Sequence, residues 1–112
     1  MNNDFLQSEE GRKLEQRYRI LREELAGLGW ITDGSVTPNH PGHWRWTRKV
    51  KAKTITTGLS EEQAGIFKAA IADHRRLESI LREMRAISQE VLLNSAAGVR
   101  KKASTKNIPN RP

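Results

Sequence analysis

The chain has 112 residues, a length that allows one domain, and its hydrophobic fraction of 36% allows only a small core. Its formal net charge is +7, and it has no cysteine, which excludes disulfides and thiolate metal sites and is typical of a cytoplasmic protein. The N-terminus is polar and acidic and no apolar run approaches the ~20 residues of a membrane span, so we expect neither a signal peptide nor a membrane partner.

The first predicted element is a helix over about residues 5–28. Leucine and tyrosine side chains recur there at spacings of 3 and 4, which places them on one stripe with a period typical of coiled coils. Gly11 weakens the first turns by roughly 1 kcal/mol relative to alanine, so a later start is an alternative. Gly27 and Gly29 predict the end, because glycine adopts the left-handed conformation at a helix C-terminus without steric cost. The stripe consists of Leu14, Tyr18, Leu21, Leu25 and Leu28.

The segment within residues 30–57 predicts a small antiparallel sheet of about three strands. A first strand is expected over residues 30–37, with a bulge or bend at Asp33-Gly34. Turn-forming residues follow over 38–42. Residues 43–50 then alternate in polarity, which is typical of a second strand.

A two-residue turn at Lys51-Ala52 would join the second strand to a third over residues 53–57. Lys-Ala is a poor turn of this kind, because neither residue favours a positive φ. The register nevertheless keeps the apolar residues together. It pairs Val50 with Lys53, Arg48 with Ile55, and Trp46 with Thr57.

A second, longer helix is predicted over about residues 61–96, with its end at about Asn94 or Ala97. Ser60 and Gln63 have the spacing of a capping box at its start, and Gly98 supplies a terminator. Its apolar side chains form one broad stripe with spacings of 3, 4 and 7, which is too long for a small sheet to cover. We therefore expect the first helix to pack antiparallel to it with the sheet at one end, and the far end to project, where it could dimerise.

These elements together predict a single α+β domain over residues 1–98. The tail over residues 99–112 contains five basic residues, two prolines and no aromatic or acidic residue. That composition predicts disorder, and such a tail could bind nucleic acid without specificity.

Positive charge is segregated in the middle of the chain. Between Asp33 and Glu61 there is no acidic residue, whereas five residues are basic. Cations kept together without acids indicate an anionic partner, most commonly a phosphate backbone. The sequence thus predicts a nucleic-acid-binding accessory protein with DNA or RNA as its partner. The candidate contacts are Arg45, Arg48, Lys49, Lys51 and Lys53.

Structural explanations stay open for the same segment. Trp44 and Trp46 share a strand face with Val50, so they are either core residues facing the helices or rings on which a base stacks. On the opposite face, Arg45 and Lys49 could equally protect an exposed strand from aggregation or meet a protein partner.

Nothing in the sequence indicates catalysis, a cofactor or a small-molecule substrate. Two loop histidines, His40 and His43, do not supply the four ligands of a structural zinc site. The alternative function class is therefore also non-enzymatic: a protein–protein adaptor or homodimer module that uses the long amphipathic helix. Leu81→Asp or Met84→Asp would dissociate such a dimer.

Several short motifs follow one another in order between residues 28 and 91. They are Leu28-Gly29-Trp30, Gly34-Ser35-Val36, Trp44 to Val50, Lys53-Thr54, Leu59 to Gln63, and Arg75-Arg76-Leu77. This succession resembles a family of small bacterial and archaeal proteins known only as a domain of unknown function. The resemblance implies a link to mobile genetic elements, and it does not indicate which activity the protein has. Many members carry a cysteine cluster where this chain has Thr37 to Gly42, so a metal-bound or cysteine-dependent role does not transfer.

Overall fold

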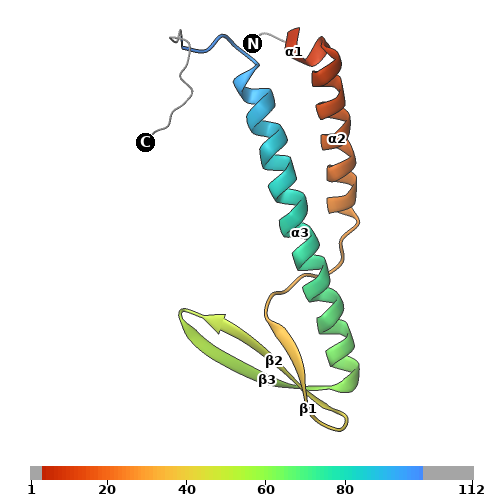
Figure 1. The fold of residues 1–112 in the computed structure, drawn as a ribbon. Coiled ribbons are helices and arrows are strands. Elements are labelled where there is room, and N and C mark those ends of the chain that lie inside the picture. Colours follow the sequence, from red (N-terminus) through yellow and green to blue (C-terminus); the bar gives the residue numbers. More distant parts are fainter. Residues whose placement is uncertain (1–3, 100–112) are drawn as a thin grey trace.

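The structure, a computed structural model, describes residues 4–99. Its elements are α1 (Asp4–Gln7), α2 (Glu9–Ala26), β1 (Ser35–His40), β2 (His43–Val50), β3 (Lys53–Ser60) and α3 (Glu61–Leu93). The predicted α+β fold class is confirmed, with an N-terminal helical segment, an antiparallel sheet of order β1-β2-β3 and a long C-terminal helix (Figure 1). The predicted disorder of the tail concerns residues that, apart from Val99, lie outside the described ones.

The predicted helix over residues 5–28 is divided at Ser8. The Ser8 hydroxyl accepts a hydrogen bond from the Gly11 amide at 3.0 Å and donates to the Phe5 carbonyl, so it begins α2 where α1 ends. Gly11 is buried at this corner, and a Cβ there would lie 2.0 Å from the Phe5 carbonyl oxygen. Glycine therefore lets α1 turn back against α2. Gly27 ends α2 as predicted, but with φ of −88° rather than in the left-handed conformation.

The helices α2 and α3 pack antiparallel, as predicted (Figure 1). Two ion pairs show the direction, since Arg17 pairs with Glu83 at 2.7 Å and Arg76 pairs with Glu24 at 3.2 Å. Both α1 and α2 reach the C-terminal end of α3, where Tyr18 packs into the shared core. The expected projection of that end is therefore wrong, because α1 and α2 run alongside it and α2 packs on Ile87 and Val91.

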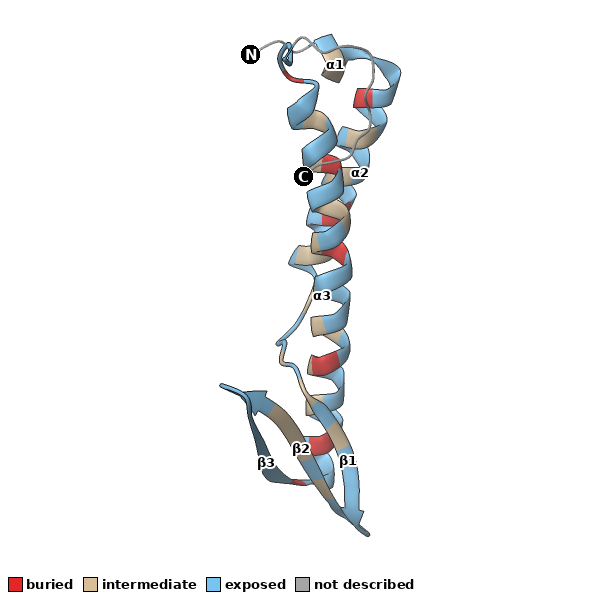
Figure 2. Ribbon diagram, turned by 60° about the vertical axis from the view of Figure 1, so that its left-hand side comes forward, coloured by how far each residue is buried: buried red, intermediate tan, exposed pale blue. Residues whose placement is uncertain are grey.

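The apolar side chains of α3 lie on two opposite faces. Ile80 is buried with Leu21 of α2, whereas Phe67 packs on Trp46 of the sheet with ring centroids 4.7 Å apart. The step from Ile71 to Ile80 is about two and a half turns at about 3.6 residues per turn, so buried Ile71 shares the side of Phe67. The single broad stripe predicted for this helix is thus wrong, and the helix separates two small cores (Figure 2). The core on the α2 side also includes Leu14, Tyr18, Leu25, Leu28, Met84, Ile87 and Val91.

The start of α3 agrees with prediction, and its end lies at the earlier of the two predicted positions. The capping box Ser60–Gln63 is present with both hydrogen bonds. At the other end, the Asn94 side-chain amide and the Ser95 hydroxyl donate to main-chain carbonyls four residues back, at 2.8 and 2.7 Å. These side chains satisfy the last carbonyls, so the helix ends at Leu93 with Asn94 as its C-cap, and it does not continue to Ala97.

The chain between α2 and β1 crosses α3 in an irregular path. The Gly29 amide donates to the Asp73 carboxylate at 2.9 Å, and the Thr32 amide donates to a main-chain carbonyl of α3 at 3.3 Å. Because α3 satisfies these amides, no strand ladder forms before Ser35. The strand predicted from Trp30 onwards is wrong in this part.

The first hairpin is tighter than predicted. β1 continues through residues 38–40, and the chain reverses only at Pro41-Gly42. The pairing register shifts between Pro38 and His40, which marks a bulge at Asn39.

The second hairpin has the predicted turn and register. Lys51 and Ala52 adopt φ values of 51° and 68°, the positive φ that a two-residue hairpin turn requires. β3 runs to Ser60, beyond the predicted end at residue 57. The predicted pairs Val50–Lys53, Arg48–Ile55 and Trp46–Thr57 are all present.

Candidate nucleic-acid interface

Alternation along β2 sends its side chains to two different faces of the sheet. One face, which carries Trp44 and Trp46, turns toward α3. The opposite face, here called the outer face, is formed by the intervening residues and their cross-strand partners. The outer face consists of Ser35, Thr37, His40, His43, Arg45, Thr47, Lys49, Thr54, Thr56, Gly58 and Ser60.

The two tryptophans of β2 are packing residues. The Trp46 ring contacts Phe67 of α3, and its indole N–H donates to the Asp33 carbonyl at 2.8 Å. The Lys68 ammonium of α3 lies 4.0 Å from the centroid of the Trp44 ring. These contacts favour the core interpretation over base stacking, since α3 already occupies one side of each ring.

Arg48 is separated from the other predicted contacts. Its Cζ lies 3.8 Å from the centroid of the Trp46 ring, and its Nη1 donates to the Thr57 hydroxyl at 3.2 Å. The guanidinium is therefore held on the inner face by a cation–π contact and a hydrogen bond. It stands on the opposite side of the sheet from Arg45 and Lys49.

The other four predicted cations are exposed. Arg45 and Lys49 stand on the outer face, Lys51 lies in the turn, and Lys53 begins β3. None of the four takes part in a salt bridge among residues 4–99. In that part of the chain the lysines and arginines that pair with carboxylates all lie on helices: Lys13, Arg17, Arg19 and Arg76.

The ribbon formed by β2 and β3 extends beyond the helix. Figure 1 shows the turn that joins these strands at a distance from α3. Val50 and Ile55 belong to the inner face, yet they are 40% and 36% exposed, whereas Leu59 at the other end of β3 is only 6% exposed. The end of the ribbon around Lys51 is therefore open to a partner on both faces.

The histidines of the first hairpin do not assemble a metal site. The rings of His40 and His43 meet edge to face, with centroids 6.3 Å apart. Within residues 4–99, no three or more side chains of His, Cys, Asp or Glu are grouped so that they could hold a metal ion. The described helices also include none with the length and apolarity needed to span a bilayer.

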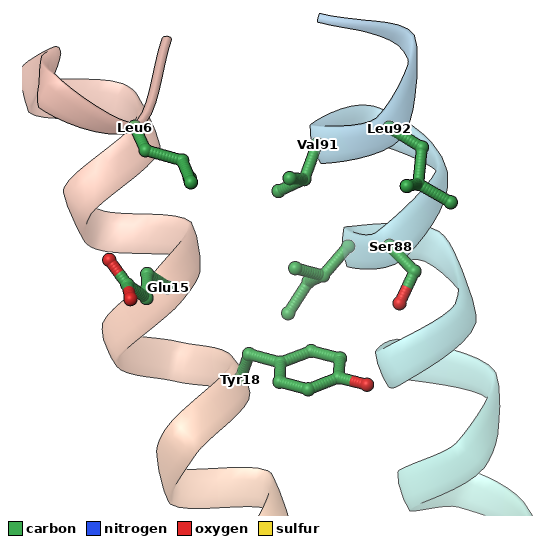
Figure 3. A pocket seen from close by; sticks show the side chains of 7 residues that line it. Leu6, Glu15, Tyr18, Ser88, Val91 and Leu92 are labelled. Carbon is green, nitrogen blue, oxygen red and sulfur yellow. The ribbon is translucent and has the colours of Figure 1, made fainter. Parts of the chain in front are cut away.

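An apolar groove at the opposite end of the molecule was not predicted. It lies between the α1–α2 segment and α3, has a volume of about 240 Å³, and has Glu15 at its side (Figure 3). The run Val91-Leu92-Leu93 is the sequence signal for it, because three consecutive apolar residues are wider than one helical stripe. Its apolar lining consists of Leu6, Tyr18, Ile87, Val91 and Leu92.

No family model, curated protein or solved structure matches this chain. The resemblance to a domain of unknown function therefore stays a prediction. The functional argument rests on the geometry of the sheet and of the groove.

Proposed function

We propose that the protein binds nucleic acid and that the exposed cations of the β2–β3 ribbon contact its phosphates. The observation that carries this proposal is the outer face, which holds Arg45 and Lys49 among hydroxyl side chains and has no acidic residue. These cations have no carboxylate partner among the described residues. A phosphate backbone supplies the missing negative charge, and threonine hydroxyls are common donors to phosphate oxygens.

The position of the cations argues against a purely protective role. Lysine guards a sheet when it stands on an edge strand, where unpaired main-chain groups invite another strand. Arg45 and Lys49 stand instead on β2, which is the central strand and is paired on both sides. Of the four exposed ribbon cations, Lys53 is the one whose place on an edge strand fits that explanation.

A charge-swap variant tests the proposal. Arg45→Glu, Lys49→Glu and Lys51→Glu together should abolish binding to labelled duplex and single-stranded nucleic acid at low salt, measured by fluorescence anisotropy. The matched control makes the same change of charge on the helices through Arg12→Glu, Arg82→Glu and Arg85→Glu, three exposed residues. That control should retain most of the affinity, because its charges lie away from the ribbon.

The basic tail needs a separate control. A full-length variant with Arg100, Lys101, Lys102, Lys106 and Arg111 changed to glutamine should bind more weakly but still respond to the ribbon substitutions. Binding that survives the ribbon variant and disappears in the tail variant would refute the proposal. So would an absence of binding to any nucleic acid at low salt.

A second candidate function, a homodimer or adaptor module, is favoured by the apolar groove. Leu92 lines the groove and is 65% exposed, which leaves apolar surface available to a partner.

Met84 packs against the α2–α3 core, so Met84→Asp would unfold the protein rather than dissociate a dimer. Leu92→Asp is the appropriate change, and Leu93→Asp, which is 78% exposed and outside the groove lining, is its control. Sedimentation velocity over a range of concentrations should show dissociation with the first and not with the second, and a monomer throughout would eliminate this candidate.

A further inference from the structure

The chemistry of the outer face narrows the kind of nucleic acid that fits it. Its charged side chains are Arg45 and Lys49, four residues apart on one strand, and hydroxyl groups surround them. The aromatic side chains of the outer face are His40 and His43, which meet edge to face at the end of the sheet away from Lys51, so no row of rings follows the ribbon for successive bases of a single strand to stack on. The packing of Trp44 and Trp46 toward α3 removes the tryptophan rings from this role.

The shape of the ribbon also limits which kind of nucleic acid can fit it. Neighbouring strands lie about 4.8 Å apart. Beyond the Ser35–Thr47 pair, β2 and β3 therefore continue as a narrow two-stranded ribbon that extends past α3, and at Arg45 the third strand, β1, widens the sheet to about 10 Å. The major groove of B-form DNA, about 12 Å wide, admits such a ribbon, whereas its minor groove is about 6 Å wide. The major groove of an RNA helix is too deep and narrow for side chains to read.

The side chains on the ribbon suit the edges of bases as well as phosphates. Arginine and lysine donate to guanine O6 and N7. Threonine forms hydrogen bonds to base edges through its hydroxyl group, or contacts the thymine methyl group through its own methyl group. Gly58 lies opposite Arg45, and no atom lies within 4 Å of where a Cβ would stand there, so the guanidinium has open space beside it. The Thr47 and Thr56 hydroxyls lie 3.4 Å apart across the strands and present a polar pair next to Arg45 and Lys49.

We propose that the β2–β3 ribbon inserts into the major groove of duplex DNA with its outer face toward the bases. Arg45 and Lys49 contact base edges together with Thr54 and Thr56, and Lys51 at the turn contacts phosphate. This inference rests on the proposed function, since it specifies the nucleic acid and the groove for the same surface.

Blocking each groove separately tests the inference with the full-length protein. The probes are an A·T-containing duplex, the same duplex with distamycin filling the minor groove, and the same duplex with every cytosine replaced by glucosylated 5-hydroxymethylcytosine, which fills the major groove. We expect glucosylation to raise the Kd at least about tenfold and distamycin to change it less than about threefold. A matching single strand and RNA duplex should bind more weakly than the plain DNA duplex.

The outcomes separate the two proposals. Binding that survives glucosylation, that distamycin blocks, or that is equally strong on the single strand or the RNA duplex overturns the major-groove inference and leaves phosphate binding intact. A failure to bind every probe at low salt overturns the proposed function itself, and the inference with it.

Two single substitutions distinguish base contacts from phosphate contacts. Affinities are measured for the sequences recovered by selection from a random duplex library and for the unselected library. Lys51→Gln should weaken both to the same extent, whereas Arg45→Gln should reduce the ratio between them by about tenfold. An Arg45→Gln variant with an unchanged ratio would contradict the assignment of Arg45 to base edges. Both side chains are exposed, so neither change should impair folding.

Discussion

Gly11 and Gly65 both lie in helices, yet their surroundings are opposite. A Cβ at Gly11 would meet the Phe5 carbonyl oxygen at 2.0 Å, whereas a Cβ at Gly65 would have no atom within 4 Å. The same substitution should therefore have opposite effects at the two sites. The effect on stability at Gly11 depends on the contact with α1, and the effect at Gly65 depends on helix propensity.

Gly11→Ala should lower the free energy of unfolding by about 1–3 kcal/mol, because main-chain atoms of α1 must move away. Gly65→Ala should raise it by about 0.5–1 kcal/mol, since alanine is the better helix former at an exposed position. Urea unfolding followed by circular dichroism measures both. A Gly11→Ala variant that is more stable than the parent would show that the corner between α1 and α2 does not depend on glycine.

Ala52 also departs from its preferred conformation, with φ of 68° in the second hairpin turn. A residue with a Cβ loses roughly 1–2 kcal/mol of stability in the left-handed region, and glycine does not. Glycine loses more conformational entropy on folding, so the substitution regains only part of that free energy. Ala52→Gly should raise the stability by about 0.5–1 kcal/mol. Ala69→Gly, at an exposed position of α3, is the control and should lower it by about 1 kcal/mol. A loss of stability in both variants would contradict the positive φ at Ala52.

Among the elements, β2 and the start of α3 could be predicted because local patterns determine them. Alternation along residues 43–50 places Trp44 and Trp46 on one face, and together with the two-residue turn at Lys51-Ala52 it sets the register with β3. The capping box at Ser60 is equally local. Candidate ribbon cations were found in the same way, since a segment without acids is visible in the sequence.

The parts that could not be predicted depend on contacts between distant residues. The path after α2 follows from the Gly29 amide meeting Asp73, which no local pattern encodes. The helical period places Ile71 and Ile80 on opposite sides of α3, but which side meets the sheet and which meets α2 depends on contacts with distant residues. The separation of Arg48 from Arg45 was visible in the alternation, but its contact with the Trp46 ring was not.

The packing of α2 on α3 includes one ion pair with a defined pH dependence. Arg17 donates from Nε to Glu83 Oε2 at 2.7 Å and from Nη2 to Oε1 at 3.0 Å, and these hydrogen bonds hold the pKa of Glu83 below its ordinary value of 4.5. A carboxylate with a lowered pKa in the folded state stabilises the fold above its ordinary pKa. That contribution disappears as the pH falls through the lowered value.

Arg17→Gln should therefore reduce the free energy of unfolding near pH 7, and the difference from the parent should shrink as the pH falls below about 4.5. Urea unfolding at several pH values measures the difference. Arg19→Gln is the control, since Arg19 pairs with Glu15 of the same helix at 3.5 Å. A difference that is constant between neutral and acidic pH would show that Glu83 does not carry the effect.

As a whole the molecule is elongated, with extents of 64 × 33 × 18 Å and a radius of gyration of 21.3 Å. A compact domain of 100 residues has a radius of about 13 Å. α3 connects a helical core at one end with a sheet at the other, so the basic ribbon and the apolar groove lie far apart (Figure 1). Nucleic-acid binding by the ribbon and self-association through the groove are therefore compatible in one molecule.

The central claim is that exposed cations of the ribbon contact phosphate, and the salt dependence of binding tests it most directly. The measurement is the affinity of the full-length protein for a random DNA duplex across a series of salt concentrations. Each neutralised phosphate contributes about −0.9 to the slope of log affinity against log salt. In a random duplex, where Arg45 and Lys49 lack matched base edges and contact phosphate instead, the cations Arg45, Lys49, Lys51 and Lys53 predict a slope near −4, reduced by about 1 in Lys51→Gln. A flat response, or a slope that Lys49→Gln and Lys51→Gln leave unchanged, would contradict the claim.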